Sequence, residues 1–324
     1  MKRTLGLFLL ITMTLLGGCG KISLGDCSSA NDDTTIETTE SSMVPADNEI
    51  SEKNDAKDTS MDETKSIIIA DGNTLEARFS VPEGYERVKA EEDSLASFLR
   101  EYKLEEDGSP VLLYDGTEKG NQSAHAAVFS LPIESYDLQQ CADSVMRVYA
   151  EYYWQTEQQD KIAFHFTNGF LCEYTRWREG YRVKVNGNDV SWSKEAAYDD
   201  TYESFTQYMK TVFTYAGTLS MESMETETIS LAEMTVGDVI IKGGSPGHVV
   251  MVVDVCENAD GKKAYLLAQG YMPAQEFHVI NNPKHGEDPW YYEEEMTFPL
   301  RTAEYTFSEE RMIRRLTYSK GSEG

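Results

Sequence analysis

Two strand-forming segments near the C-terminal end, residues 236–256 and 264–280, constrain the fold of this chain most strongly. The first contains the apolar run Val249-Val250-Met251-Val252-Val253, whose β-branched side chains favour strands. Earlier in the chain, apolar residues recur at helical spacing. Helices are predicted over residues 94–104 and 201–216, a long helix within residues 133–158, and two shorter strands over residues 111–114 and 126–129. Helices that precede a cluster of strands predict an α+β fold.

The first 18 residues are typical of a bacterial secretion signal. A basic pair at residues 2–3 precedes an apolar stretch over residues 5–16, which is too short to span a membrane and suits the apolar core of a signal peptide. The run Leu16-Gly17-Gly18-Cys19 then resembles the lipobox of bacterial lipoproteins. The resemblance implies cleavage before Cys19 and lipid attachment to its thiol. We therefore expect an extracytoplasmic protein that is lipid-anchored to a bacterial membrane, with a plain secretory signal as the alternative.

Residues 19–66 predict a disordered acidic tether between this anchor and the folded part. Residues 21–66 hold 12 acidic side chains and 4 lysines among many Ser, Thr and Asn, a net charge of −8. A segment with so little apolar surface cannot offset the entropy lost on folding. As a flexible coil it would span roughly 40 Å. Residues 67–324 are expected to form a single α+β domain.

The acidity of the chain excludes one class of function. The net charge is −27, and the predicted domain accounts for −21 of it. Nucleic-acid binding needs clustered basic residues, whereas the three arginines within residues 311–315 follow directly after two glutamates. We therefore expect no nucleic-acid partner and no polybasic attachment to a membrane surface.

The domain contains three cysteines, Cys141, Cys172 and Cys256, once Cys19 is assigned to lipid and Cys27 to the tether. An odd number outside the cytoplasm leaves at least one thiol unpaired, unless a disulfide joins two molecules. The sequence leaves open whether Cys172 and Cys256 pair. A free thiol is a candidate nucleophile, and Cys141 is the best placed of the three.

Cys141 is expected in the first turn of a helix. Asp137 followed by Gln140 is a variant of the capping box, with Asp137 as the N-cap. The free N–H groups and the dipole of a helix N-terminus stabilise a thiolate, so we expect the pKa of the Cys141 thiol to lie below the ~8.5 of a free thiol. The alternative is that Cys141 is a small buried apolar residue beside Val145 and Val148.

His248 and Gln269 complete a candidate site. His248 opens its strand directly after the Gly-rich turn 243–247, which would hold the imidazole near a surface and suits a general base. Gln269 ends the next strand, and in an antiparallel pair of these strands it would orient that imidazole. An activated thiol needs a nucleophile, a base and an orienting group, so Cys141, His248 and Gln269 are the candidate catalytic residues. A hydrogen-bonded structural histidine is the alternative.

The order of these elements resembles the NlpC-type cell-wall peptidases, papain-like hydrolases that cut the peptide stems of peptidoglycan. The resemblance implies a papain-like core, in which the helix bearing Cys141 packs on an antiparallel sheet, with N-terminal and inserted elements. It also implies Cys141 as nucleophile, His248 as base and Gln269 as orienting residue. The chain departs from the family at Gln140-Cys141-Ala142-Asp143, where the family has Asp-Cys-Ser-Gly, and in the 106 residues between Cys141 and His248.

Four further segments resemble a family of bacterial lipoproteins catalogued as domain of unknown function 4846. They are Gln140-Cys141-Ala142-Asp143, Phe166-Thr167-Asn168-Gly169-Phe170, Gly243-Gly244-Ser245-Pro246-Gly247-His248 and Gln269-Gly270-Tyr271-Met272-Pro273-Ala274-Gln275. The resemblance covers about residues 72–316 and implies one folded unit, without implying an activity.

The chain lacks the sequence motifs of metal sites, phosphate-binding loops and serine hydrolases. The chain has no His-Glu-x-x-His, no Cys-x-x-Cys and no Gly-Lys-Ser/Thr phosphate loop, so no metal and no cofactor are expected. It also lacks the Gly-x-Ser-x-Gly of serine hydrolases. The aromatic run Trp290-Tyr291-Tyr292 is expected to pack in the core or at its rim rather than to stack on sugars.

Two functions from different classes remain. The first is an envelope lipoprotein that acts as a thiol (Cys-His) peptidase or amidase, a hydrolase or transferase on the amide bonds of cell-wall peptides. The alternative is a non-catalytic envelope lipoprotein that keeps a papain-like fold for binding or scaffolding. The expected partners are the membrane, through lipid at Cys19, and a peptidoglycan peptide. The sequence does not give the oligomeric state.

Overall fold

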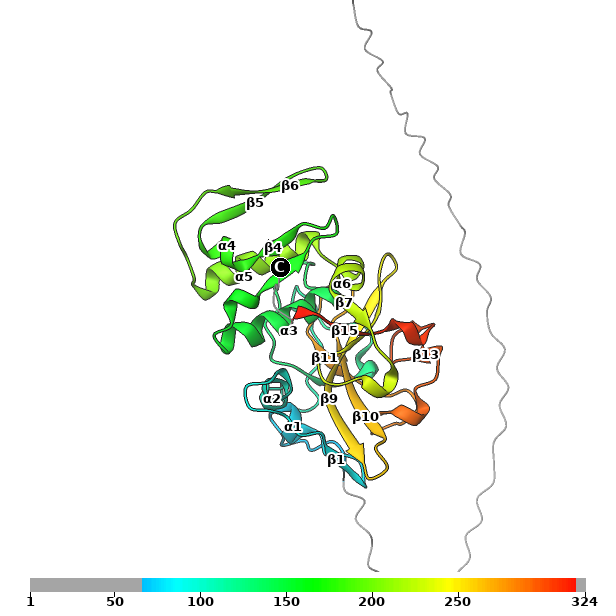
Figure 1. Ribbon diagram of the computed structural model, residues 1–324. Coiled ribbons are helices and arrows are strands. Elements are labelled where there is room, and N and C mark those ends of the chain that lie inside the picture. The colour runs from blue at the N-terminus through cyan, green and yellow to red at the C-terminus, as the bar shows by residue number, and fades with distance from the viewer. Residues whose placement is uncertain (1–65, 319–324) are drawn as a thin grey trace, which may run out of the picture. The chain divides into compact units, whose positions relative to one another are not determined.

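The computed structural model describes residues 66–318, drawn in colour in Figure 1. The predicted signal peptide, Cys19 and the tether up to residue 65 lie outside the described residues, as do residues 319–324. None of the helices formed by residues 66–318 is both long and apolar enough to cross a membrane.

An antiparallel sheet of nine strands organises the described residues (Figure 1). Its main path runs β2-β11-β10-β9-β8-β15-β7, with β1 paired to β9 and β12 paired to β10. Every pairing within it is antiparallel. The strands are β1 (Tyr85–Arg87), β2 (His125–Val128), β7 (Thr226–Thr228), β8 (Val239–Lys242), β9 (His248–Asn258), β10 (Lys263–Gln269), β11 (His278–Ile280), β12 (Tyr291–Tyr292) and β15 (Ile313–Leu316).

Helices and three small two-stranded sheets surround the large sheet. The α-helices of the described part are α1 (Leu75–Arg78), α2 (Leu95–Glu101), α3 (Cys141–Gln155), α4 (Tyr174–Arg178), α5 (Tyr202–Tyr215) and α6 (Thr218–Met224). The small sheets pair β3 (Ala163–His165) with β4 (Leu171–Glu173), β5 (Tyr181–Asn186) with β6 (Asp189–Lys194), and β13 (Leu300–Arg301) with β14 (Thr306–Phe307). Single 3-10 turns lie at Gln122–Ala124, Gln159–Lys161, Leu231–Glu233, Glu293–Glu295 and Glu310–Met312. Together with the large antiparallel sheet, the helices confirm the predicted α+β class.

Strand β9 is buried on both faces of the sheet. Val249, Met251 and Val253 belong to the main apolar cluster, whereas Val250 and Val252 belong to a second cluster on the opposite face. Alternate side chains of a strand point to opposite faces, so an unbroken apolar run requires a layer on each side. The sequence of this run therefore determines that the strand is central.

The helix α3 supplies part of the layer on one face. It packs against β9, and its buried residues Val145, Met146 and Tyr149 belong to the same cluster as Val249. Helices α4 and α5 and the two hairpins β3-β4 and β5-β6 lie between α3 and α6 in the chain. In Figure 1 this segment lies at the top of the view, with α3 below it.

Two predicted helices begin where the sequence indicates. The hydroxyl of Ser94 accepts from the backbone N–H of Ser97 (3.2 Å) at the start of α2, and Thr201 accepts from Ser204 (3.2 Å) at the start of α5. These are N-caps, which satisfy N–H groups that lack an intrahelical acceptor.

Two predicted boundaries are wrong. The long helix predicted within residues 133–158 is present as α3, but it begins at Cys141 rather than directly after Asp137. The strand predicted over residues 111–114 is reduced to isolated bridges at Leu112 and Leu113. There a side chain replaces part of the strand ladder, since the Leu112 N–H donates to the carboxylate of Glu276 (2.8 Å).

Candidate active site

Cys141 is the first residue of α3. The sequence predicts Asp137 as the N-cap, but Gln140 occupies that position and its backbone N–H donates to Oδ2 of Asp143 (3.1 Å). Asp137 instead accepts from the backbone N–H of Ala274 (2.7 Å) and from the side-chain amide of Gln140 (3.0 Å). Because these contacts tie Asp137 to the segment after β10, the helix starts later and the thiol stands at its N-terminus.

The Cys141 thiol is held in its protonated form. The residue is 8% exposed, and burial raises the pKa of the thiol to about 11, with a further rise from Asp143. The backbone N–H groups of Ala142 and Val249 act in the opposite direction, so the sulfur lies against the backbone at the start of β9. The expectation of a pKa below ~8.5 is therefore wrong, because desolvation outweighs the helix N-terminus.

Alkylation of Cys141 by iodoacetamide should consequently be slow at neutral pH. Its rate is expected to keep rising to pH 10 without a plateau, and to be about a hundredfold below that of free cysteine at pH 8. Peptide mass spectrometry of the full chain, sampled over time at each pH, measures the rate at Cys141 alone. A plateau centred at or below pH 8.5 would contradict the assignment of a desolvated thiol.

His248 is the first residue of β9, and the turn before it is packed tightly. Gly244 has a φ of +103°, which favours glycine, and a β-carbon at Gly247 would lie 2.4 Å from both Gly244 O and Thr218 Oγ1. His248 is 2% exposed, and its ring packs against Tyr271 and Tyr305 with centroids 4.7 and 4.9 Å away. The predicted rigid placement behind a Gly-rich turn is thus present, but the imidazole is buried.

The predicted contact between Gln269 and His248 is present, and its surroundings define which atoms carry protons. The Gln269 amide nitrogen donates to Oε2 of Glu304 (2.7 Å), which turns its carbonyl oxygen toward Nε2 of His248 (2.8 Å). A carboxylate only accepts, so this order of atoms is required. His248 therefore donates from Nε2, and in the neutral ring Nδ1 keeps the lone pair.

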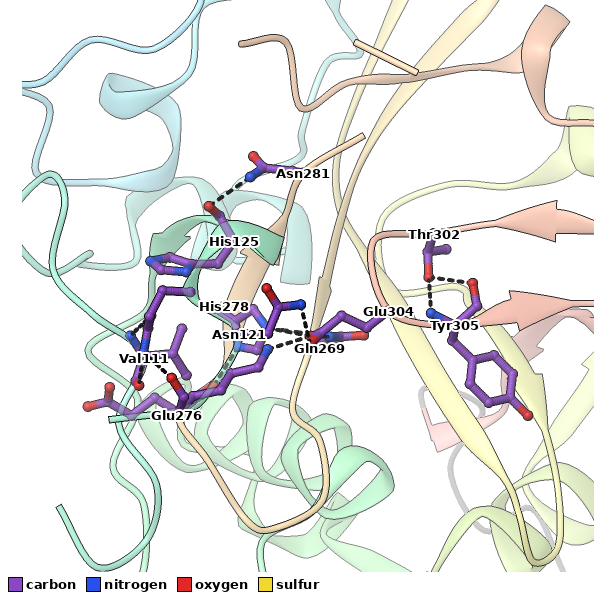
Figure 2. Close-up of polar contacts among 12 residues, drawn as sticks. Val111, Asn121, His125, Gln269, Glu276, His278, Asn281, Thr302, Glu304 and Tyr305 are labelled. Carbon is purple, nitrogen blue, oxygen red and sulfur yellow. Dashed lines mark hydrogen bonds and ion pairs between the residues drawn. The ribbon is translucent and has the colours of Figure 1, made fainter. Parts of the chain in front are cut away.

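A second histidine completes the arrangement behind Gln269 (Figure 2). Across the β10-β11 ladder, Gln269 faces His278, whose Nε2 lies 3.4 Å from the Gln269 amide nitrogen and whose Nδ1 lies 2.8 Å from Glu276 O. Burial lowers the pKa of His248 to about 4 and that of His278 to about 3. Both imidazoles are therefore neutral at pH 7.

An ion pair supports this chain of hydrogen bonds. Glu304 lies in the loop between β13 and β14, and its carboxylate pairs with the ammonium of Lys119 and accepts from Asn121 (3.2 Å). Figure 2 shows the Glu304 side chain reaching toward Gln269 and Asn121. The same loop is closed by a hydrogen bond from the Thr302 backbone N–H to Tyr305 O (2.9 Å), so one turn delivers both Glu304 and Tyr305 to the site.

The thiol and the imidazole share one neighbourhood. Tyr271 and Tyr305 both pack on His248, and burial raises the pKa of each hydroxyl, with Cys141 contributing to the rise in both. A pocket of about 410 Å³ opens beside Cys141. Its wall is formed by the start of α3, the junction of α5 with α6 and the turn before His248. Of the three predicted residues, Cys141 lines this pocket, whereas His248 and Gln269 do not, and His248 directly follows the turn 244–247 that forms part of its wall.

Sequence reasoning missed several residues of the site. His278 faces Gln269 from the neighbouring strand, and the eight residues between them form a connection too long to fix that register from the sequence. Asp143 lies two residues after Cys141 but was not singled out. Lys119, Glu304 and Tyr305 come from loops without a local motif, whereas Tyr271 lies in the family-like segment 269–275.

The remaining cysteines and aromatic residues are structural. Cys172 and Cys256 are buried free thiols, which answers the question that their sequence left open. Trp290 is fully buried and its indole N–H donates to Ser80 O (2.9 Å), as expected of a core residue. Within residues 66–318, no group of three or more His, Cys, Asp or Glu side chains is arranged to hold a metal ion.

Fold and site together define a mixed α+β protein in which a buried thiol lines a pocket and a hydrogen-bonded His-Gln pair begins directly after the turn that forms part of the pocket wall. The chain belongs to the family described as Domain of unknown function (4846), whose model matches residues 75–314. No curated protein and no solved structure matches the chain.

Proposed function

We propose that this protein is an extracytoplasmic lipoprotein, anchored through Cys19, with thiol hydrolase or transferase activity on the amide bonds of cell-wall peptides. The observation that carries the proposal is the placement of Cys141 at the N-terminus of α3, beside a pocket and against the backbone of Val249. Val249 directly follows His248, whose Nε2 is bonded to Gln269. The order helix, antiparallel strands and polar orienting residue supports the likeness to papain-like, NlpC-type peptidases.

The hydrogen bonds of the site indicate which atoms carry protons, and this gives each residue a role in the proposed reaction. Because Gln269 holds the Nε2–H of His248, Nδ1 is the basic nitrogen that would take the proton from Cys141. The sulfur would then attack an amide carbonyl, with the free N–H groups of the first turn of α3 as donors to the developing oxyanion. The amine leaves with the proton from Nδ1, and a thioester remains on Cys141.

The second half of the reaction decides between the two activities. Water attacking the thioester releases a carboxylic acid and regenerates the thiol, which is hydrolysis. An amine attacking in its place forms a new amide bond, which is transfer. In the free protein both the thiol and the imidazole are neutral at pH 7, so proton transfer has to accompany attack on a bound substrate.

The envelope location rests on the sequence. The lipobox-like run before Cys19 and the acidic tether of residues 19–66 support a domain that stands away from the membrane surface. The negative charge of the domain also favours separation from anionic lipid.

A non-catalytic envelope module is the second candidate. The observation that favours it is the thiol itself, which is 8% exposed and has a pKa of about 11. Reactive cysteines are normally more acidic and more accessible. In this alternative the pocket beside Cys141 binds a peptide without cutting it.

Incubation with purified peptidoglycan stem peptides tests the activity. Mass spectrometry should detect cleavage or amide exchange by the full chain, and Cys141→Ala and His248→Ala should each lower the rate at least ~100-fold. Cys256→Ala is the matched control, because this buried thiol lies on β9 away from the pocket and should leave the rate within about twofold. If the unaltered protein converts none of the peptides, the binding module becomes the preferred function.

A further inference from the structure

The pocket beside Cys141 is bordered by large apolar side chains that are left exposed. Leu219, in the first turn of α6, is 48% exposed, and Met272, in the segment after β10, is 56% exposed. Both line the pocket, and Ala142 and Phe213 add buried apolar lining from α3 and α5. Exposed apolar side chains that gather at a concave site mark a place where a ligand removes them from water.

The charges of this pocket disfavour an anionic ligand. Among the described residues that line it there are two carboxyl groups, Asp137 and Asp143, and no Lys, Arg or His. Burial raises the pKa of the Asp143 carboxyl to about 8, so it is neutral at pH 7. Asp137 already accepts hydrogen bonds from Ala274 and Gln140 and does not need a ligand as its partner. A ligand carboxylate would therefore find no counter-ion here, in a domain whose net charge is −21.

The polar side chains of the lining favour a peptide over the acyl chain of a lipid. Gln140, Thr167, Thr218 and Ser245 line the pocket together with the apolar residues. The hydroxyl of Thr218 donates to Gly244 O (3.2 Å), so its oxygen is free to accept a hydrogen bond. A peptide backbone offers N–H and C=O groups to such side chains, whereas an acyl chain offers only hydrocarbon.

We propose that the pocket beside Cys141 binds an uncharged, apolar side chain of a peptide, and that Leu219 and Met272 determine this specificity. Contact with these two residues removes apolar surface of both partners from water. The inference rests on the proposed function, since it names the substrate class of that site as peptides with an apolar side chain next to the amide bond that Cys141 would attack. A carboxylate at that position is rejected because the lining offers it no cation.

Thiol reagents that differ only in the length of an alkyl chain test the inference without requiring catalysis. The full chain is treated at pH 9 with methyl, ethyl, propyl and butyl methanethiosulfonate, and peptide mass spectrometry gives the rate at Cys141. Each rate is divided by that of the same reagent with free cysteine, and the ratio between two reagents cancels the titration of Cys141 itself. Full burial of a methylene would raise the rate about fourfold. Because Leu219 and Met272 are about half exposed, we expect about twofold for each methylene, and about eightfold from methyl to butyl.

Leu219→Ser and Met272→Ser should each lower this butyl-to-methyl ratio to about fourfold, and the double variant should bring it to within about twofold of one. Both side chains are exposed, so the variants should fold. Val185→Ser is the matched control, because Val185 is an exposed apolar residue of β5 outside the lining, and it should keep the full ratio. An equal ratio in the unaltered protein and in the double variant would overturn the inference.

Protection of Cys141 from the methyl reagent identifies the class of ligand. We expect Nα-acetyl-leucine amide to slow labelling at least threefold more than Nα-acetyl-glycine amide, and Nα-acetyl-glutamate α-amide to slow it no more than the glycine compound. Stronger protection by the glutamate compound than by the leucine compound would overturn the inference. Octanamide has as many carbon atoms as the leucine compound but no peptide backbone, and equal protection by it would assign the pocket to an acyl chain instead. Alkyl selectivity without peptide cleavage would leave the binding specificity standing and remove only the hydrolase.

Discussion

Replacing Lys119 by methionine is expected to lower the free energy of unfolding by about 3 kcal/mol. Lys119 is 7% exposed, and its ammonium is the cation that faces the carboxylate of Glu304, whose side chain is 11% exposed. Methionine retains the apolar stem but leaves that carboxylate without a counter-ion. Removing one partner is costly because the remaining charge stays desolvated. Urea unfolding of the full chain at pH 7 measures the loss.

The double variant Lys119→Met with Glu304→Gln is the matched control. It removes both charges, and the single amide oxygen of the glutamine can still accept from Gln269, the more buried of the two donors, so the double variant should recover at least half of the stability lost by the single variant. Equal losses in the single and the double variant would show that packing around Lys119, and not the isolated charge of Glu304, is responsible.

The same pair bears on the proposed chemistry through Gln269. The carboxylate of Glu304 determines which end of the Gln269 amide faces His248, and that end in turn places the proton on Nε2. The ammonium of Lys119 is the counter-ion of the Glu304 carboxylate, which lies near the neutral imidazoles of His248 and His278. The proton on Nε2 of His248 and the orientation of the Gln269 amide therefore follow from one buried ion pair that lies outside the predicted site.

The parts of the site that could be predicted lie in local patterns of the sequence. The Gly-rich turn before the Val-rich run predicts that His248 is the first residue of a strand. Gln269 could be predicted as its partner because it is the polar residue that ends the next strand. Antiparallel pairing of neighbouring strands then made their contact foreseeable. For Cys141, a helix start was foreseeable, but the cap was not, because Asp137 is occupied by Ala274 from a segment far along the chain.

What could not be predicted depends on burial and on loops. The pKa of Cys141 is dominated by desolvation, which the sequence of one helix does not give. Glu304 reaches Gln269 from a turn between two short strands, and Lys119 reaches Glu304 from another loop. Neither loop has a motif that links it to the cysteine. The fold class could be predicted because it depends on the order of strong helix and strand signals.

Asp143→Asn is expected to stabilise the protein, by roughly 4 kcal/mol at pH 7. Burial raises the pKa of the Asp143 carboxyl from 3.8 to about 8. Between these values the native state holds a proton that the unfolded state has released, so stability falls as the pH rises from 3.8 and levels off above about 8. Asparagine does not ionise and keeps an oxygen that accepts the Gln140 N–H, so the variant avoids this loss.

The dependence on pH separates ionisation from packing. The gain should be near zero at pH 4, grow by about 1.4 kcal/mol per pH unit, and reach a plateau above pH 8, as measured by urea unfolding at pH 4, 6 and 8. A gain that is the same at all three values would point to packing. Asp137→Asn serves as the comparison and should not stabilise, because both hydrogen bonds to Asp137 are made in the folded protein.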